Sequence, residues 1–356
     1  MDDTVAISMC HCDSCRHATG EICVSYHPIE APVLSDLNNT STYTSSDGWT
    51  RHFCATCGCH ILRRRESDGS PEYEVATGIL IGSSSDKPGL TVVFKRHVEV
   101  SDTKDGGSSV WISEVDGNKI DLDPEPQSVD HAVKRHPTET RTPKDALPAS
   151  CDCGTVSFHI TRPDATSLLP RSNFPDLTHA YCSTPASTLS NPSNVKWWLC
   201  PGEKYRAGTC TCRSCRLISG FEIQTWAFVP RSNIHFHAPS PGSVDGTTTV
   251  PLDFQTLPAG ILTSYASSPD VQREFCGGCG ATVFWHDKWR PDLIDVSVGL
   301  LRAEDGARAE AWLDWWTERV SFSDDAETGR VESQARWARG LVSGLEKGLE
   351  LWTQEG

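Results

Sequence analysis

The chain has little methionine, little positive charge and no long apolar run, and each shortage narrows what it can be. Only 2 of its 356 residues are methionine, and 32 lysines and arginines face 47 aspartates and glutamates, for a net charge of -15. Nucleic-acid binding requires a basic face because phosphate neutralisation dominates affinity, so the charge balance argues against a nucleic-acid partner. The sequence has no apolar stretch of about 18 residues, so we expect no membrane-spanning helix and no membrane partner.

The amino-terminal sequence MDDTVAISMCHC has acidic residues where a signal peptide needs a basic flank. We therefore expect a reducing compartment, by default the cytoplasm. Sixteen cysteines in such a chain are more consistent with metal ligation than with disulfides.

Three sequence blocks occur twice in the same order, which indicates a duplicated domain. The paired blocks are residues 10–20 (CHCDSCRHATG) with 210–220 (CTCRSCRLISG), 51–58 (RHFCATCG) with 273–280 (REFCGGCG), and 76–80 (ATGIL) with 297–301 (SVGLL).

Composition between and after the copies suggests the domain limits. Residues 117–150 are proline-rich, charged and poor in large apolar side chains, as linkers are. Beyond residue 330, Trp337, Leu341, Leu345 and Leu349 approximate helical spacing, which predicts an amphipathic helix closing the second domain; a frayed tail is the alternative. The predicted division is a first domain over 1–118, a linker over 119–149, a second domain over 150–330 and a helix over 331–356.

Local sequence elsewhere predicts short strands, so the fold class is expected to be mainly β. The expected strands, rich in β-branched and aromatic residues and separated by Gly, Pro and Ser clusters, are 155–160, 223–229, 281–286 and 295–301. Residues 183–194 are expected to form a long polar insertion.

Four cysteines at the two ends of the second repeat predict a closed metal site. Cys151 and Cys153, two apart on a segment expected to be extended, would point to one side. Cys276 and Cys279 form a knuckle in which Gly280 permits the tight turn. Two plus two thiolates complete a tetrahedral zinc site, which should be structural.

A separate cluster, Cys210, Cys212 and Cys215, predicts a different kind of site. Three thiolates can converge on one zinc ion and leave its fourth position open, as in catalytic sites. They also overcompensate the charge of the ion, which makes it a poor activator of water and a good acceptor of a soft thiolate. The alternatives are a redox site able to form a disulfide and a closed zinc site completed by a distant ligand.

The first repeat has the three-cysteine cluster and the knuckle but lacks the C-x-C pair. Its cluster is Cys10, Cys12 and Cys15, and its knuckle is Cys54 and Cys57. The C-x-C pair is missing because only nine residues precede Cys10, so either the amino terminus is truncated or this copy lacks the closed site. The candidate substitute ligands are Cys23, Cys59 and His60, whereas Cys182 and Cys200 are expected to be small buried hydrophobes.

Together these motifs resemble the glutathione-dependent formaldehyde-activating enzyme (GFA) family, also called the CENP-V/GFA domain family. The family pattern is C-x-C-G, then C-H-C-x-x-C-R, then F-C-x-x-C-G. The second repeat matches it except that Thr211 replaces the usual histidine, which the first repeat has as His11. The resemblance implies two tandem Mss4-like β-tent zinc domains, with a structural ion on Cys151, Cys153, Cys276 and Cys279 and an active-site ion on Cys210, Cys212 and Cys215.

The resemblance also implies carbon–sulfur lyase activity that joins glutathione and formaldehyde into S-hydroxymethylglutathione. A thiol bound to zinc ionises readily, and its sulfur would then meet the aldehyde carbon at close range. Arg16 and Arg216, next to the triads, are candidates to steer a substrate carboxylate, or are solvated surface residues. Seven motif cysteines in the second repeat and five in the first predict about three tightly held zinc ions per chain.

The alternative is a non-catalytic module in which zinc only scaffolds a thiol-binding or protein-interaction surface. Some relatives with this domain act in chromatin, but the acidic charge of this chain disfavours that role. The open triads favour the enzyme, because a scaffold needs only the closed site.

Overall fold

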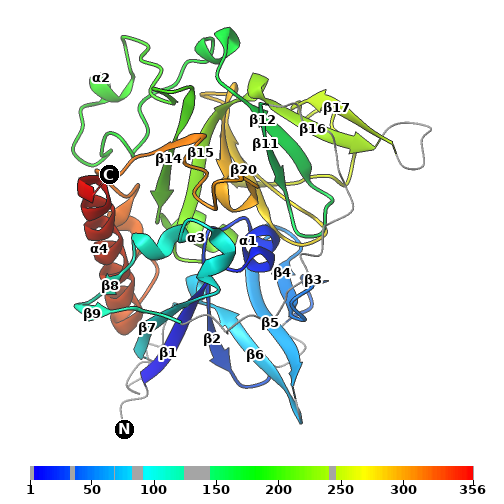
Figure 1. Ribbon diagram of the computed structural model, residues 1–356, viewed down its shortest axis with the longest axis vertical. Coiled ribbons are helices and arrows are strands. Elements are labelled where there is room, and N and C mark those ends of the chain that lie inside the picture. The colour runs from blue at the N-terminus through cyan, green and yellow to red at the C-terminus, as the bar shows by residue number, and fades with distance from the viewer. Residues whose placement is uncertain are drawn as a thin grey trace.

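The chain folds into two halves, one for each repeat, which meet near its middle (Figure 1). The computed structural model describes residues 4–32, 37–67, 69–81, 91–123, 145–239 and 246–355. The predicted class is confirmed: the molecule is mainly β, with a long helix at its carboxyl end.

The first repeat is built on one eight-stranded sheet in the order β10-β7-β1-β2-β6-β5-β4-β3. Helix α1 (Asp13–Thr19) connects β1 to β2, and a small hairpin, β8–β9, follows β7. The strand bounds are β1 Thr4–Cys10, β2 Val24–Ile29, β3 Thr40–Thr44, β4 Thr50–Cys54, β5 His60–Ser67, β6 Ser70–Ala76, β7 Thr91–Val98, β8 Glu114–Val115, β9 Asn118–Lys119 and β10 Asp121–Leu122.

The second repeat has the corresponding sheet, β13-β14-β15-β21-β20-β19-β18, with β22 parallel to β14. It also has a four-stranded sheet, β11-β12-β16-β17, that has no counterpart in the described part of the first repeat. The four predicted strands correspond to β12, β15, β20 and β21, but the last ends at Ser297, and Val298–Leu300 form a 3-10 helix instead. The bounds are β11 Ala146–Ser150, β12 Ser157–Thr161, β13 Leu199–Cys200, β14 Lys204–Cys210, β15 Gln224–Pro230, β16 Ile234–Pro239, β17 Thr247–Pro251, β18 Thr263–Ser268, β19 Val271–Phe275, β20 Thr282–Asp287, β21 Leu293–Ser297 and β22 Leu313–Trp315, with α2 Ala186–Leu189 in the insertion and α3 Arg213–Ser219 after β14.

The C-x-C-x-x-C motif forms the same strand-to-helix junction in both repeats. Its first cysteine ends a strand, and its second, Cys12 or Cys212, caps the amino terminus of the following helix. The capping sulfur accepts the backbone N–H of the third cysteine at 3.3 Å in the first repeat and 3.2 Å in the second. Capping satisfies one of the unpaired amides of the first helical turn. The motif therefore positions three sulfur atoms by local backbone structure alone.

The two repeats meet through a reciprocal backbone contact. Gly78 N–H donates to the carbonyl of Gly220 at 2.8 Å, and its counterpart Gly299 N–H donates to the carbonyl of Gly20 at 3.1 Å. Equivalent residues thus exchange roles, as in a two-fold symmetric dimer. A Cβ atom on Gly78 would lie 2.5 Å from the backbone of Gly220, and one on Gly299 would lie 2.4 Å from that of Gly20. The contact is close because Gly78 and Gly299, each at the centre of a one-turn 3-10 helix, have no side chain.

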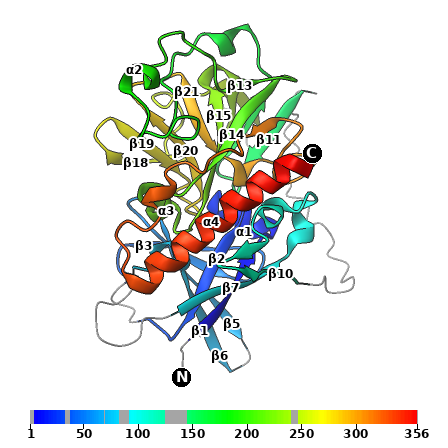
Figure 2. The same cartoon turned by 90° about the vertical axis from the view of Figure 1, so that its left-hand side faces the viewer.

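The carboxyl-terminal helix α4 (Glu332–Glu355) is present, as the sequence predicts, but covers a different surface. It contacts β7 and β8 of the first repeat, and it lies diagonally across the two halves in Figure 2. The Trp337 ring is 5.5 Å from that of Phe94, and the Trp352 ring is 5.7 Å from that of Trp111, measured between centroids. The expectation that it closes the second domain was wrong, because the apolar surface that it covers belongs largely to the first.

The domain limits drawn from composition stay predictions. Strands β9 and β10 extend the first repeat to Leu122, and β11 begins the second at Ala146. Most of the predicted linker, residues 124–144, lies outside the described residues. Within the described ranges, no helix has the length and apolar character needed to cross a membrane.

Replacing Gly78 with alanine should weaken the contact between the repeats. The added methyl cannot fit against the Gly220 backbone without a backbone shift, so we expect a loss of about 1–3 kcal/mol in the free energy of unfolding. Gly299→Ala should lower the free energy of unfolding by about the same amount, because Gly299 makes the equivalent contact with Gly20. Denaturant titration measures both.

Gly117→Ala is the control, because its Cβ would meet nothing within 4 Å and only its positive φ of 74° is unfavourable. If Gly78→Ala is no more destabilising than this control, the close contact is not a significant source of stability.

Candidate metal centres

Four cysteine sulfur atoms of the second repeat converge as the sequence predicts. The Sγ atoms of Cys151, Cys153, Cys276 and Cys279 all lie within 4.8 Å of one another. Cys151 Sγ is 3.5 Å from Cys153 Sγ and 3.7 Å from Cys276 Sγ. A Zn–S length of about 2.3 Å in a tetrahedral site places ligand sulfurs about 3.8 Å apart, so the spacing fits a four-thiolate zinc site.

The C-x-C pair lies in a turn, not on an extended strand. Cys151 and Cys153 follow β11, and the knuckle Cys276–Cys279 follows β19. The backbone N–H groups of Val156 and Gly278 donate to cysteine sulfurs at 3.3 and 3.4 Å, which stabilises thiolates. The cluster therefore joins the four-stranded sheet to the larger sheet of this repeat.

The closed cluster also contacts the first repeat. Asp152, between the two turn cysteines, accepts a hydrogen bond from Tyr43 Oη at 2.7 Å, and its N–H donates to the His17 carbonyl at 3.0 Å. Tyr43 belongs to β3, so the turn that carries two of the ligands is anchored on the other half of the molecule.

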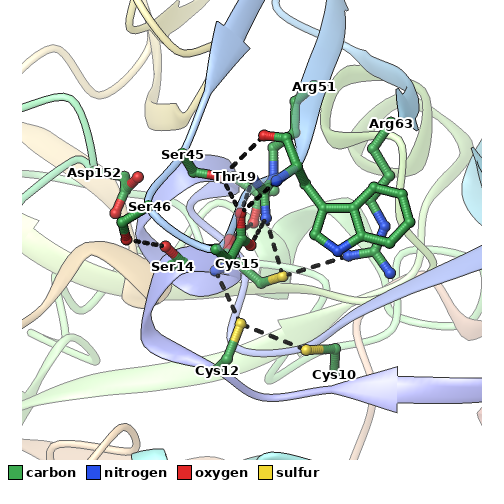
Figure 3. A network of polar contacts seen from close by, with 12 residues as sticks. Cys10, Cys12, Ser14, Cys15, Thr19, Ser45, Ser46, Arg51, Arg63 and Asp152 are labelled. Atoms are coloured by element: carbon green, nitrogen blue, oxygen red, sulfur yellow. Dashed lines mark hydrogen bonds and ion pairs between the residues drawn. The ribbon is translucent and has the colours of Figure 1, made fainter. Parts of the chain in front are cut away.

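The first-repeat triad is compact and faces two guanidinium groups (Figure 3). Cys15 Sγ accepts hydrogen bonds from Arg51 Nη2 at 3.2 Å and Arg63 Nη1 at 3.8 Å. Hydrogen bonds from Cys10 and Cys12, followed by these two positive charges, hold the pKa of the Cys15 thiol well below its ordinary value despite burial. The triad thus presents a thiolate, the form that binds metals.

The second triad has one such arginine. Arg273 Nη2 donates to Cys215 Sγ at 3.5 Å and to Ser214 Oγ at 3.0 Å. Hydrogen bonds from Cys210 and Cys212, then Arg273, hold the pKa of Cys215 well below its usual range. Arg51 and Arg273 occupy the same place in R-x-F-C-x-x-C-G. Sequence reasoning gave this arginine no role, although its presence in both repeated blocks was the available signal.

The surroundings of the two triads differ at matching positions. Arg63 lies over the Tyr26 and Trp49 rings, 4.1 Å from each centroid. Its counterpart in the second repeat is Trp285, and that of Tyr26 is Trp226. Trp226 belongs to the apolar cluster that contains Cys210 and Cys215, and Trp285 packs against it. The first triad therefore has a second arginine beside it, paired with Glu74, where the second triad has a tryptophan.

Each repeat also supplies one side chain to the region of the other triad. Phe221 of the second repeat packs in a cluster with Cys15 and Tyr26. Its counterpart Glu21 is fully buried, and neither carboxylate oxygen makes a hydrogen bond of ordinary geometry. Burial, followed by repulsion from Cys215, raises the pKa of Glu21 well above its usual value, while the Ser219 hydroxyl and Arg273 partly oppose the shift. Sequence reasoning did not identify either residue.

The two arginines proposed as substrate contacts are occupied elsewhere. Arg216 is buried and donates to the carbonyl of Gly78 in the first repeat and to that of Thr328 at 2.8 Å. Arg16 is also buried and pairs with Asp13. Arg216 therefore holds the repeats together, and neither side chain is a surface group available to a substrate carboxylate.

The residues considered as substitutes in the first repeat do not rebuild its closed site. Within the described residues, Cys54 and Cys57 share no metal-sized cluster with a third donor, and Cys23, Cys59 and His60 join none. Burial lowers the pKa of His60 to about 3, and neither of its ring nitrogens has a partner.

Three further expectations concern single residues. His11 is buried and hydrogen-bonds through Nε2 to His97 Nδ1 at 2.8 Å. Cys200 is half-buried, and burial raises the pKa of its thiol to about 12. Cys182 is exposed, so the expectation that it is a buried hydrophobe was wrong. It lies directly before the insertion.

Comparison with known proteins identifies one family. The family model described as glutathione-dependent formaldehyde-activating enzyme matches residues 1–96 and 197–319, more than half of the chain. Both triads and both knuckles fall inside the matched ranges, whereas Cys151 and Cys153 fall between them. Neither the curated proteins nor the solved structures contain a match.

Removing a closed-site ligand should cost far more stability than removing an open-site ligand. Cys276→Ala leaves three thiolates of a site whose metal binding is itself folding free energy, of order 10 kcal/mol in small zinc domains. Cys212→Ala removes a cap worth about 1 kcal/mol and one ligand of an open site. Thermal unfolding of the zinc-loaded variants measures the difference, and equal melting temperatures would contradict the assignment.

Removing the arginine beside the second triad should weaken metal binding there. Arg273→Met deletes the donors to Cys215 while retaining most of the side-chain length. Outer-shell partners of metal ligands are worth about 10- to 100-fold in affinity, so we expect a loss of that size for a single metal equivalent. Competition with a chromogenic chelator measures it. Arg231→Met, an exposed arginine paired with Asp292, is the control and should leave all equivalents unchanged.

Proposed function

The chain belongs to the glutathione-dependent formaldehyde-activating enzyme family, and on that premise we propose that it is a zinc-dependent carbon–sulfur lyase acting on a glutathione-like thiol and a small aldehyde. The product would be an S-hydroxymethyl thioether such as S-hydroxymethylglutathione. The observation that carries the proposal is the form of the triads. Each brings three sulfur atoms together, with no fourth donor among the described residues, which suits a site that accepts an exogenous thiolate.

Zinc in such a site supplies a positive charge that favours the ionised form of a bound thiol. The protein's own groups act around it. Arg51 and Arg273 hold the Cys15 and Cys215 sulfurs in place through N–H···S hydrogen bonds. Buried aromatic side chains around Cys215, with Trp226 among them, limit the access of water.

Two guanidinium groups distinguish the surroundings of the first triad. Arg63 donates to Cys15 Sγ at 3.8 Å and is also paired with Glu74 at 2.6 Å. Arg51, which also donates to Cys15, is paired with Asp47 at 2.7 Å, so both arginines act near the triad as N–H donors more than as a net positive charge. We infer that the first repeat takes part in thiol binding even without a closed site of its own.

The ligand sets support about three zinc ions per chain, one closed and two open. None of the sixteen cysteines forms a disulfide, which suits a reducing compartment such as the cytoplasm.

The second candidate is a non-catalytic zinc-scaffolded binding module. The anchoring of Asp152 on Tyr43 favours a scaffold role for the closed site, because it links the two repeats. It does not account for two open triads, each with its own arginine.

Cys212→Ser is the sharpest test. A serine hydroxyl can accept the Cys215 N–H and keep the helix cap, so the fold should survive while the triad loses a thiolate. We expect glutathione binding at the second site, measured by calorimetry, to disappear, together with any acceleration of the formaldehyde reaction over the uncatalysed rate.

Cys200→Ser, outside both triads, is the control and should bind as the parent does. Unchanged binding in Cys212→Ser and Cys12→Ser alike would overturn the proposal. Binding lost in the triad variants, with the parent showing no acceleration, would favour the binding module.

A further inference from the structure

The knuckle of the first repeat lacks the C-x-C pair that meets the corresponding knuckle of the second. The two turns match: Gly58 N–H donates to the Cys54 carbonyl at 2.9 Å, and Gly280 N–H donates to the Cys276 carbonyl at 2.8 Å. Both glycines have positive φ, 82° and 81°. In the part of the chain that the structure describes, Cys54 and Cys57 share no metal-sized cluster with a third donor. The first repeat therefore holds a C-x-x-C dithiol in a well-defined turn.

The two thiols of this turn lie close together and differ in acidity. Each of them alters the pKa of the other. Burial alone would raise the pKa of Cys54, but hydrogen bonds from the backbone N–H groups of Thr56 and Cys57 hold that pKa below its ordinary value. Burial raises the pKa of Cys57 to about 11. A C-x-x-C pair with one more acidic thiol is the usual form of a thiol–disulfide exchange centre, in which that thiol attacks first.

The turn lies at the surface of the first repeat. Ala55 and Thr56, between the two cysteines, are exposed, and Cys54 and Cys57 are half-buried. The next cysteine along the chain, Cys59, is buried, and burial raises the pKa of its thiol. A small disulfide in solution can therefore reach the dithiol but not the neighbouring cysteine.

We propose that Cys54 and Cys57 form a thiol–disulfide exchange site whose substrate is a low-molecular-weight disulfide such as oxidised glutathione. The Cys54 thiolate attacks one sulfur of the substrate, the substrate S–S bond breaks, and the first thiol leaves with the proton that Cys54 gave up. The Cys57 thiol then loses its proton and attacks the Cys54 sulfur, which releases the second thiol with that proton. The protein dithiol is oxidised to a disulfide, and the substrate is reduced to two thiols. The site does not depend on the proposed lyase function.

Incubation of the zinc-loaded full-length protein with oxidised glutathione tests the site. Alkylation of the remaining thiols and peptide mass spectrometry then locate each disulfide. We expect a disulfide between Cys54 and Cys57 that excess reduced glutathione reverses. Cys276 and Cys279, which form the same turn, are the matched control in the same sample and should stay reduced, because bound zinc holds both sulfurs. Equal oxidation of the two knuckles would overturn the proposal, since the reaction would then be unspecific.

Single variants test the order of attack. Cys57→Ser keeps the attacking thiol but cannot release the adduct, so glutathione should accumulate on Cys54 as a mixed disulfide. Cys54→Ser should form an adduct on Cys57 about 10-fold more slowly, because much less of that thiol is ionised and its greater nucleophilicity offsets this only in part. Absence of the disulfide in the parent would overturn the proposal. So would a loss of one zinc equivalent in Cys57→Ser, because the knuckle would then be a metal ligand.

Discussion

The structure depends on the reciprocal contact between the two repeats. Gly78 donates to Gly220, and Gly299 donates to Gly20, at the ends of the helices that follow the cysteine triads. Because those helices end at the interface, the residue after each terminal glycine enters the other half of the molecule. This places Phe221 beside the first triad and buries Glu21 near the second. The metal centres are thus not independent copies, since each is partly enclosed by the other repeat.

Duplication has kept the backbone of the triads and changed what surrounds them. The strand end, the capping cysteine and the short helix are the same in both halves. Around them the first triad has Arg51 and Arg63, and the second has Arg273 with tryptophan at the position that matches Arg63. Charge and aromatic area affect what binds at an open position without altering the ligands. The two centres therefore differ in the side chains beside their cysteines.

The halves also obtain their stability differently. In the second repeat the four cysteines of the closed cluster come from two sheets, so an ion bound there would link the sheets. The described part of the first repeat has one sheet, and helix α4 from the far end of the chain covers its β7 strand. Helix α4 buries apolar side chains of the first repeat, as where Trp337 packs on Phe94, and this burial contributes to its stability.

Short-range chemistry made much of this molecule predictable from its sequence. Cysteine spacing predicted both triads and the two pairs that meet in the closed cluster, because spacing of two or three residues determines which sulfurs can lie together. Strand composition predicted the β class, and leucine spacing predicted α4.

What the sequence could not determine are the contacts between residues distant in the chain. Arg216 donates to backbone carbonyls at the interface between the repeats and does not face a substrate. Helix α4 covers the first repeat. Glu21 of the first repeat lies near the triad of the second. Local patterns indicate that a side chain is charged or that a helix has an apolar face, but they do not indicate which residues contact that side chain or face. That was decided by the packing of the two repeats, which removes some groups from water and brings others together.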